Sequence, residues 1–156
     1  MNEVNRISLA QGAIYCMSMN CDENRLSFGQ AACCEALLEA LELHGSRRDF
    51  CLPALKAIFH LCDGNANNRL KISFSGAADI LMTVLAKHSY LLSSGSSSGT
   101  GGGGGGAGGG TGDGTGGSVS VSDRIVEYAF STMIGMCLDK VGQSRLGTVG
   151  VCKVAG

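Results

Sequence analysis

Tryptophan is absent from this chain of 156 residues, proline occurs only once, at Pro53, and aromatic residues make up 5% of the sequence. All-β folds use prolines in their turns and aromatic side chains in their strands, so this composition argues against them. The hydrophobic share is nevertheless 44%, which is enough to build a core. We therefore expect a single domain of packed helices whose core consists mainly of Ala, Leu, Ile, Val, Met and Cys.

Charge of one sign is also scarce, because the formal net charge is −1 and the longest basic run is Arg47-Arg48. A nucleic-acid-binding surface needs a larger cluster of Lys and Arg. No stretch approaches the roughly 18 consecutive apolar residues of a membrane span, and the first residues lack the pattern of a secretory leader. We expect a protein that binds neither nucleic acid nor membrane and that works in the cytoplasm or the nucleus.

Cysteine is abundant, with eight residues, but its spacing does not indicate a metal site. No C-x-x-C pair occurs, and no cysteine pair is followed by histidines at the spacing of a zinc ligand set. In a reducing compartment a free cysteine behaves as a small hydrophobic residue. We expect no zinc, no disulfide and no other cofactor among Cys16, Cys21, Cys33, Cys34, Cys51, Cys62, Cys137 and Cys152.

The chain repeats itself with a spacing of 44 residues: the triplet Asn24-Arg25-Leu26 recurs as Asn68-Arg69-Leu70. A third copy begins at Ser144-Arg145-Leu146, and the segment 54–62 recurs at 129–137 with a spacing of 75. Repeats of this length indicate supersecondary units that stack in an array. The spacing of 44 also relates Ala13 to Ala57, Ile14 to Ile58, Leu37 to Leu81, Leu41 to Leu85, and His44 to His88.

The longer spacing of the last copy comes from an insertion between His88 and Val126. It contains a Gly- and Ser-rich segment at about 93–122, with six consecutive glycines at 101–106. The segment lacks the G-K-[ST] ending of a phosphate-binding loop, and no strand precedes it. Its composition is that of a low-complexity linker. We expect a disordered loop that interrupts an otherwise regular array and is dispensable for the fold.

The apolar spacing within each unit is helical. Asp49 and Asp123 are expected to act as N-caps, Pro53 fits the first turn of a helix, and Gly76 fits a break between two helices. We divide the chain into a partial repeat at 1–23, repeats at 24–67 and 68–143, and a partial repeat at 144–156. The predicted helices span about 6–19, 24–30, 32–44, 49–62, 66–74, 77–91, 123–138 and 142–148.

Residues 54–68, which read ALKAIFHLCDGNANN, resemble the third helix of an armadillo repeat and the turn that follows it. Residues 72–85, with Gly76-Ala77 at the break, are similar to the first helix, the turn and the second helix of the next repeat. The related HEAT repeats are the nearest alternative, but the three-helix unit favours the armadillo family. The resemblance implies an all-α, right-handed α-α superhelix, a solenoid of which this chain is a fragment.

The positions that line the concave groove depart from the family pattern. Peptide-binding armadillo proteins carry a recurring Trp, and an Asn four residues later, on their third helices. Here the Trp positions hold Gly12, Lys56 and Ser131, and the Asn positions hold Cys16, His60 and Gly135. The resemblance therefore does not imply binding of a basic import signal. It leaves Lys56 and His60 as candidate partner-binding residues, and the alternative for both is an ordinary exposed position on a helix.

No arrangement of nucleophile and base is recognisable in the sequence. His60 and Cys62 are two residues apart, which places them on different faces of one helix. His44 and His88 recur at a helix C-terminus, where the helix dipole favours a structural role. We predict a non-catalytic scaffold that binds another protein or peptide through its concave helical surface. The alternatives are a regulatory or targeting segment of a larger protein such as a kinase, and an enzyme with a cysteine nucleophile of low pKa.

Overall fold

The computed structural model describes residues 3–93 and 120–149, and all secondary structure in these ranges is helical. Every predicted helix is present, and each boundary lies within one turn of the predicted one. The predicted insertion at 93–122 falls largely outside the described residues. The helices are α1 Glu3–Ser18, α2 Asp22–Gln30, α3 Cys33–His44, α4 Arg48–Cys62, α5 Ala66–Phe74, α6 Ala77–Ser93, α7 Val121–Met136 and α8 Lys140–Val149.

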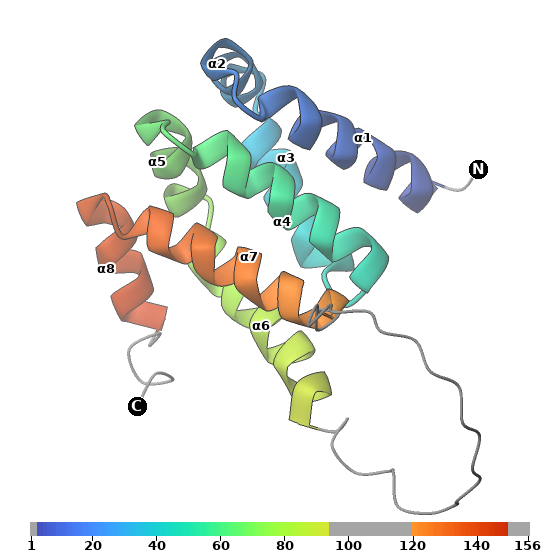
Figure 1. Ribbon diagram of the computed structural model, residues 1–156. Helices are drawn as coiled ribbons and strands as arrows, with labels where there is room; N and C mark the ends of the chain where they lie inside the picture. The colour runs from blue at the N-terminus through green and yellow to red at the C-terminus, as the bar shows by residue number, and fades with distance from the viewer. Residues whose placement is uncertain (1–2, 94–119, 150–156) are drawn as a thin grey trace, which may run out of the picture.

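Three of these helices, α1, α4 and α7, lie side by side in one layer, with α4 in the middle (Figure 1). We call them the layer helices. Helices α3 and α6 pack behind α4 and α7, and the short helices α2, α5 and α8 gather at one end (Figure 1). Each layer helix therefore belongs to the same structural position as the one 44 or 75 residues away in the sequence. None of the described helices has the length and apolar character needed to cross a bilayer.

The core lies between the layer helices and the helices behind them. Its fully buried side chains include Leu38, Leu41, Phe50, Leu55, Ile58, Leu61, Leu81, Ile125 and Met136. Among the cysteines, Cys34, Cys51 and Cys62 are buried in this core, Cys16 and Cys137 are exposed, and Cys152 lies outside the described residues. The prediction that cysteine serves as a small core residue is therefore confirmed for only part of the set.

A side-chain amide closes the C-terminal end of every layer helix. In each unit the amide nitrogen donates to a backbone carbonyl that the end of the helix would otherwise leave without a partner. The second acceptor lies 44 residues after the first, which is the sequence repeat, and the third lies 76 residues after the second, one residue beyond the spacing of 75. The pairs are Asn24 to Met17 at 2.7 Å, Asn68 to Leu61 at 2.8 Å, and Gln143 to Cys137 at 2.7 Å.

Both predicted N-caps were wrong. The N-cap of α4 is Arg47, and Asp49 lies in the first turn, where its carboxylate pairs with the Arg47 guanidinium at 2.7 Å. The N-cap of α7 is Ser120, which forms a capping box with Asp123. A carboxylate is favourable anywhere in the first turn because of the helix dipole, so an Asp does not identify the cap itself. Pro53 also lies further into its helix than predicted, beyond the first turn of α4.

Candidate functional site

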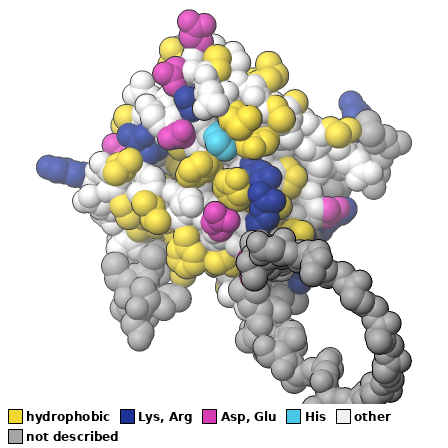
Figure 2. All heavy atoms as spheres, in the orientation of Figure 1, with side chains coloured by type: hydrophobic (Ala, Val, Ile, Leu, Met, Phe, Trp, Pro, Cys, Tyr) yellow, Lys and Arg dark blue, Asp and Glu magenta, His cyan; other side chains and the backbone are white. Residues whose placement is uncertain are grey.

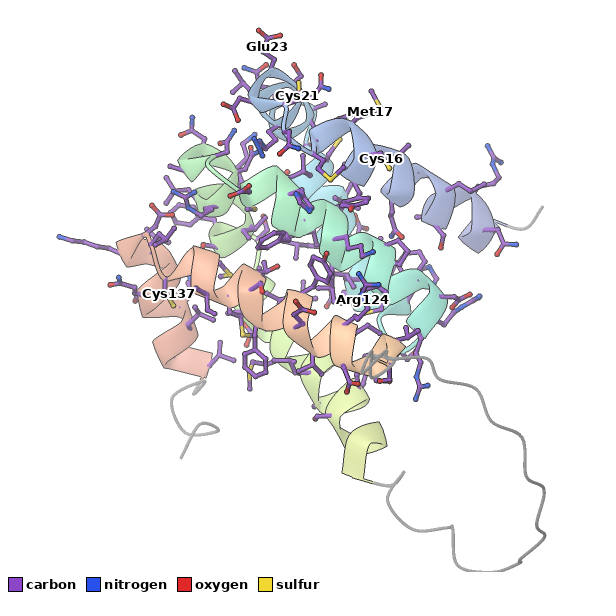
Figure 3. The ribbon with its side chains drawn as sticks, viewed as in Figure 1. Cys16, Met17, Cys21, Glu23, Arg124 and Cys137 are labelled. Carbon is purple, nitrogen blue, oxygen red and sulfur yellow. The ribbon has the colours of Figure 1, made fainter. Side chains whose placement is uncertain are left out.

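The two candidate residues, Lys56 and His60, lie one turn apart on α4, the middle layer helix. Both side chains are half-buried, and each of them contacts Tyr15 of α1. Figure 2 views the molecule from the side of the layer helices and shows hydrophobic and basic side chains next to one another on this face. Figure 3 shows Arg124 on α7, on the same side of the molecule.

Lys56 lies between two tyrosine rings that neighbouring helices contribute. Its Nζ is 5.4 Å from the ring centre of Tyr15, on α1, and 5.7 Å from that of Tyr128, on α7. An ammonium group at this distance is attracted by the negative face of an aromatic ring, with an energy of about 0.5–1 kcal/mol at a partly exposed site. The two rings therefore keep the ammonium group of Lys56 in the middle of the layer.

Aromatic rings continue this contact along the surface. The His60 ring centre is 5.0 Å from that of Tyr15 and 5.1 Å from that of Phe59, and Phe59 is 5.7 Å from Tyr128. The Phe59 contacts are edge-to-face, which is a preferred arrangement of aromatic pairs. We call these five residues the aromatic cluster: Tyr15, Lys56, Phe59, His60 and Tyr128.

The two basic side chains of the cluster, Lys56 and His60, differ in charge. Partial burial lowers the pKa of His60, the Arg25 and Lys56 charges lower it further, and only Asp63 opposes them. A histidine with a lowered pKa is neutral at pH 7. The cluster thus presents a neutral imidazole and one ammonium group, and Lys56 carries its charge.

The sequence identified two members of this cluster and missed three. Tyr15 and Phe59 are separated by the repeat spacing of 44, so aromatic residues at equivalent positions were a signal that could have been used. Tyr128 had no such signal, because the equivalent position on α4 is Pro53. It joins the cluster because α7 packs against α4.

A small cavity of about 70 Å³ lies between α4, α5 and α7. Sites for small molecules usually enclose about 300–1,000 Å³, so this cavity is too small for a metabolite. At its rim Arg69 binds the Asp139 carboxylate at 3.0 Å and the Cys62 carbonyl at 3.1 Å. The cavity is lined by Phe59, Cys62, Asp63, Gly64, Arg69, Ser131, Thr132, Gly135 and Leu138.

The arrangement of the thiols does not favour nucleophilic chemistry. A hydrogen bond from Cys62 lowers the pKa of Cys34, while sharing that bond and burial raise the pKa of Cys62. Burial raises the pKa of Cys51 to about 12. Cys34 is 0% exposed, so no substrate reaches its sulfur. The Cys62 thiol hydrogen-bonds Cys34 of α3 while His60 contacts Tyr15 of α1, which confirms that they point to different faces of α4.

Of the two other histidines, only His44 lies at the end of its helix as predicted, because His88 lies more than one turn before the end of α6. His88 is fully buried and its Nε2 bonds the Gly45 carbonyl at 2.8 Å, and His44 packs edge-on against Phe50. Within the described residues, no three His, Cys, Asp or Glu side chains come together as a metal site.

Comparison with known proteins adds no assignment: no family model, curated protein or solved structure matches this chain. The armadillo resemblance therefore remains a prediction from the residues quoted above.

Proposed function

We propose that this chain is a segment of an armadillo-type, right-handed helical solenoid that binds another protein through the surface of its layer helices. The support is the recurrence of one three-helix arrangement, in which α1, α4 and α7 take equivalent places. The hydrogen bonds from side-chain amides to carbonyls at the C-terminal ends of these helices recur as well. Stacked units of this kind create an extended surface to which several helices contribute.

The aromatic cluster is the main support for the proposal that this surface binds a protein. Interfaces are enriched in tyrosine, and their strongest contacts come from large side chains that are already held in place. Here Tyr15 and Tyr128 come from different helices, and both are fixed by contacts to α4. A partner that lies across the three helices would bury these rings with little loss of side-chain freedom.

The charge of the cluster determines what kind of partner fits. Lys56 supplies one positive charge, and His60 is neutral at pH 7 because its pKa is lowered. A peptide segment with an acidic side chain next to an apolar one would pair with Lys56 and cover the tyrosine rings. A basic peptide would meet a like charge at the centre of the surface, which disfavours it.

The test is a selection of displayed random peptides on the immobilised full chain. Affinities of the selected peptides are then measured for the parent, for Lys56→Ala and for Tyr128→Ala. We expect each substitution to weaken binding at least tenfold, about 1.4 kcal/mol. Lys87→Ala is the matched control, since Lys87 is exposed on α6, behind the layer.

Circular dichroism would verify that all four proteins keep the same helical content. Equal affinities of the parent, Lys56→Ala and Tyr128→Ala for the selected peptides would contradict the proposal. So would a selection that yields no binding peptide, or one that yields mainly basic peptides.

A further inference from the structure

His60 is held by ring contacts and not by hydrogen bonds. Its ring packs on Tyr15 and Phe59, and no residue in the described part of the chain hydrogen-bonds either of its ring nitrogens. The buried His88, by contrast, bonds the Gly45 carbonyl through Nε2. The His60 side chain is only half-buried, and Figure 2 shows a histidine at the surface of the layer helices. Its imidazole is therefore open to a hydrogen bond with a partner.

The charges around His60 come from its own segment and from α2. Lys56 lies one turn earlier on α4, Asp63 follows the end of that helix, and Arg25 comes from α2. The neighbouring layer helices bring the tyrosine rings of the cluster, and none of their described side chains adds a charge that acts on this ring. Asp63 lies 3.5 Å from Arg25, which also pairs with Asp22. His60 thus has no carboxylate of its own.

Lys56 and His60 are placed to bind one anionic group together. They are four residues apart on α4, and side chains with this spacing are neighbours on a helix surface, with about 5–6 Å between their Cβ atoms. Both also contact the ring of Tyr15. A carboxylate that pairs with Lys56 therefore comes within reach of the imidazole. A negative charge at a distance of about 4–6 Å favours the protonated form of a histidine.

We propose that the acidic side chain of the bound partner lies between Lys56 and His60, and that His60 takes up a proton when the partner binds. This inference rests on the proposed function, since it concerns the same surface and the same partner. The carboxylate of the partner supplies the counter-ion that His60 lacks in the free chain. The protonated imidazole donates a hydrogen bond to it. The proton comes from the solvent and returns there when the partner dissociates.

The pH dependence of binding follows from this proton uptake. In the free chain, partial burial and the charges of Arg25 and Lys56 lower the pKa of His60. The complex holds one more proton than the free chain, so affinity rises as the pH falls through the range in which His60 titrates. Above that range, binding relies on Lys56 and the tyrosine rings. An Asp or Glu of the partner has an ordinary pKa of about 4 and keeps its charge at pH 5.5.

The experiment measures the affinity of the tightest selected peptide for the full chain at pH 7.5 and at pH 5.5, by isothermal titration calorimetry. We expect the parent to bind at least about threefold more tightly at pH 5.5. His60→Gln, whose side chain is polar and does not titrate, should bind equally at both pH values. His44→Gln is the matched control, because His44 is also half-buried but lies on α3, away from the cluster. It should keep the pH dependence of the parent.

Proton uptake is measured directly by repeating the titrations near pH 6 in two buffers with different enthalpies of ionisation. The heat of binding to the parent should differ between the buffers, because the buffer releases the proton that His60 binds. The heat of binding to His60→Gln should not differ. A peptide whose acidic residue is replaced by its amide should bind the parent without proton uptake. Circular dichroism at both pH values verifies that each protein stays folded.

The outcomes separate this inference from the proposed function. A peptide that depends on Lys56 and Tyr128, but binds equally at both pH values and without proton uptake, overturns the inference and leaves the proposed function intact. A pH dependence that persists in His60→Gln, or one that disappears in His44→Gln, also overturns it. A selection that yields no binding peptide contradicts both.

Discussion

The two complete units of the chain, α2–α4 and α5–α7, differ in how firmly polar contacts hold them. Asn24 of the first unit donates one exposed hydrogen bond, to the Met17 carbonyl. Its equivalent Asn68 is 2% exposed and donates two, to the carbonyls of Leu61 and Arg25. The additional bond exists because α5 lies against α2 of the preceding unit. An equivalent residue thus links two units by a hydrogen bond only where a neighbouring unit covers it.

The ion pairs of the two units show the same difference. Arg25 is 3.5 Å from Asp63, whose side chain is 60% exposed, and it has a second partner in Asp22. The equivalent Arg69 is 3.0 Å from Asp139, whose side chain is only 20% exposed. Because solvent screens the first pair more than the second, we expect the second unit to depend more on its charges.

The turn between the first two helices of each unit also favours the second unit. Gly76 has a φ of +79° in the second unit, and Ala32 has a φ of +58° at the equivalent position of the first. A left-handed conformation costs a residue with a Cβ about 1–2 kcal/mol, whereas glycine adopts it freely. The first unit is therefore strained at a place where the second is not.

The largest expected effect is that of Asn68→Ala compared with Asn24→Ala. Removing Asn68 deletes two buried hydrogen bonds and should lower the free energy of unfolding by about 2–3 kcal/mol. Removing Asn24 should cost less than about 1 kcal/mol, because water replaces its amide. Urea unfolding followed by circular dichroism measures both, and equal losses would contradict the difference between the units.

A smaller effect is expected from the ion pairs. Asp139→Ala leaves Arg69 half-buried without its carboxylate and should cost about 1–2 kcal/mol. Asp63→Ala should cost less than about 0.5 kcal/mol, since Arg25 keeps Asp22. The same unfolding measurement compares them, with Asp79→Ala as a control at an exposed carboxylate of α6. A larger loss for Asp63→Ala would show that the second unit is not the more charge-dependent one.

The turn residues should give opposite signs at the two equivalent positions. Ala32→Gly removes the left-handed strain and should raise stability by about 0.5 kcal/mol, after subtraction of the freedom that glycine gains in the unfolded chain. Gly76→Ala introduces the strain and should lower stability by about 1 kcal/mol, although its Cβ would touch nothing. Thermal melts of both variants provide the measurement, and the same sign for both would refute the interpretation.

The smallest effect concerns pH and His60. Its pKa is lowered in the folded protein relative to the usual value of about 6.5, so below that pH the unfolded chain binds the proton more readily. Stability should therefore decrease as the pH falls through about 6.5. In His60→Gln this part of the decrease should be absent. Unfolding curves at pH 7.5 and pH 5.5 test it, and an unchanged pH dependence in His60→Gln would exclude His60 as the cause.

The sequence predicted the helices well because their apolar residues follow the helical period, and because the repeat aligned weak segments with clear ones. It placed Lys56 and His60 correctly on one face of one helix, since that depends only on a spacing of four residues. It did not predict the N-caps Arg47 and Ser120. The residue that caps each helix is fixed by its contact with an aspartate of the first turn, Arg47 with Asp49 and Ser120 with Asp123. In the sequence, an Asp at any position of the first turn is equally compatible with a helix start, so it does not identify the cap.

What the sequence by itself determined is the local order of this protein: eight helical segments within the described ranges, the spacing of the units, and the residues equivalent between them. The tertiary structure alone decided which equivalent positions are covered. Tyr128 joins Lys56 because α7 packs against α4, Asn68 gains a bond that Asn24 lacks, and Ile134 stays exposed where Phe59 is covered. Burial depends on which helix lies next to a residue, and a periodic sequence specifies the same local face whether or not a neighbour is there to cover it.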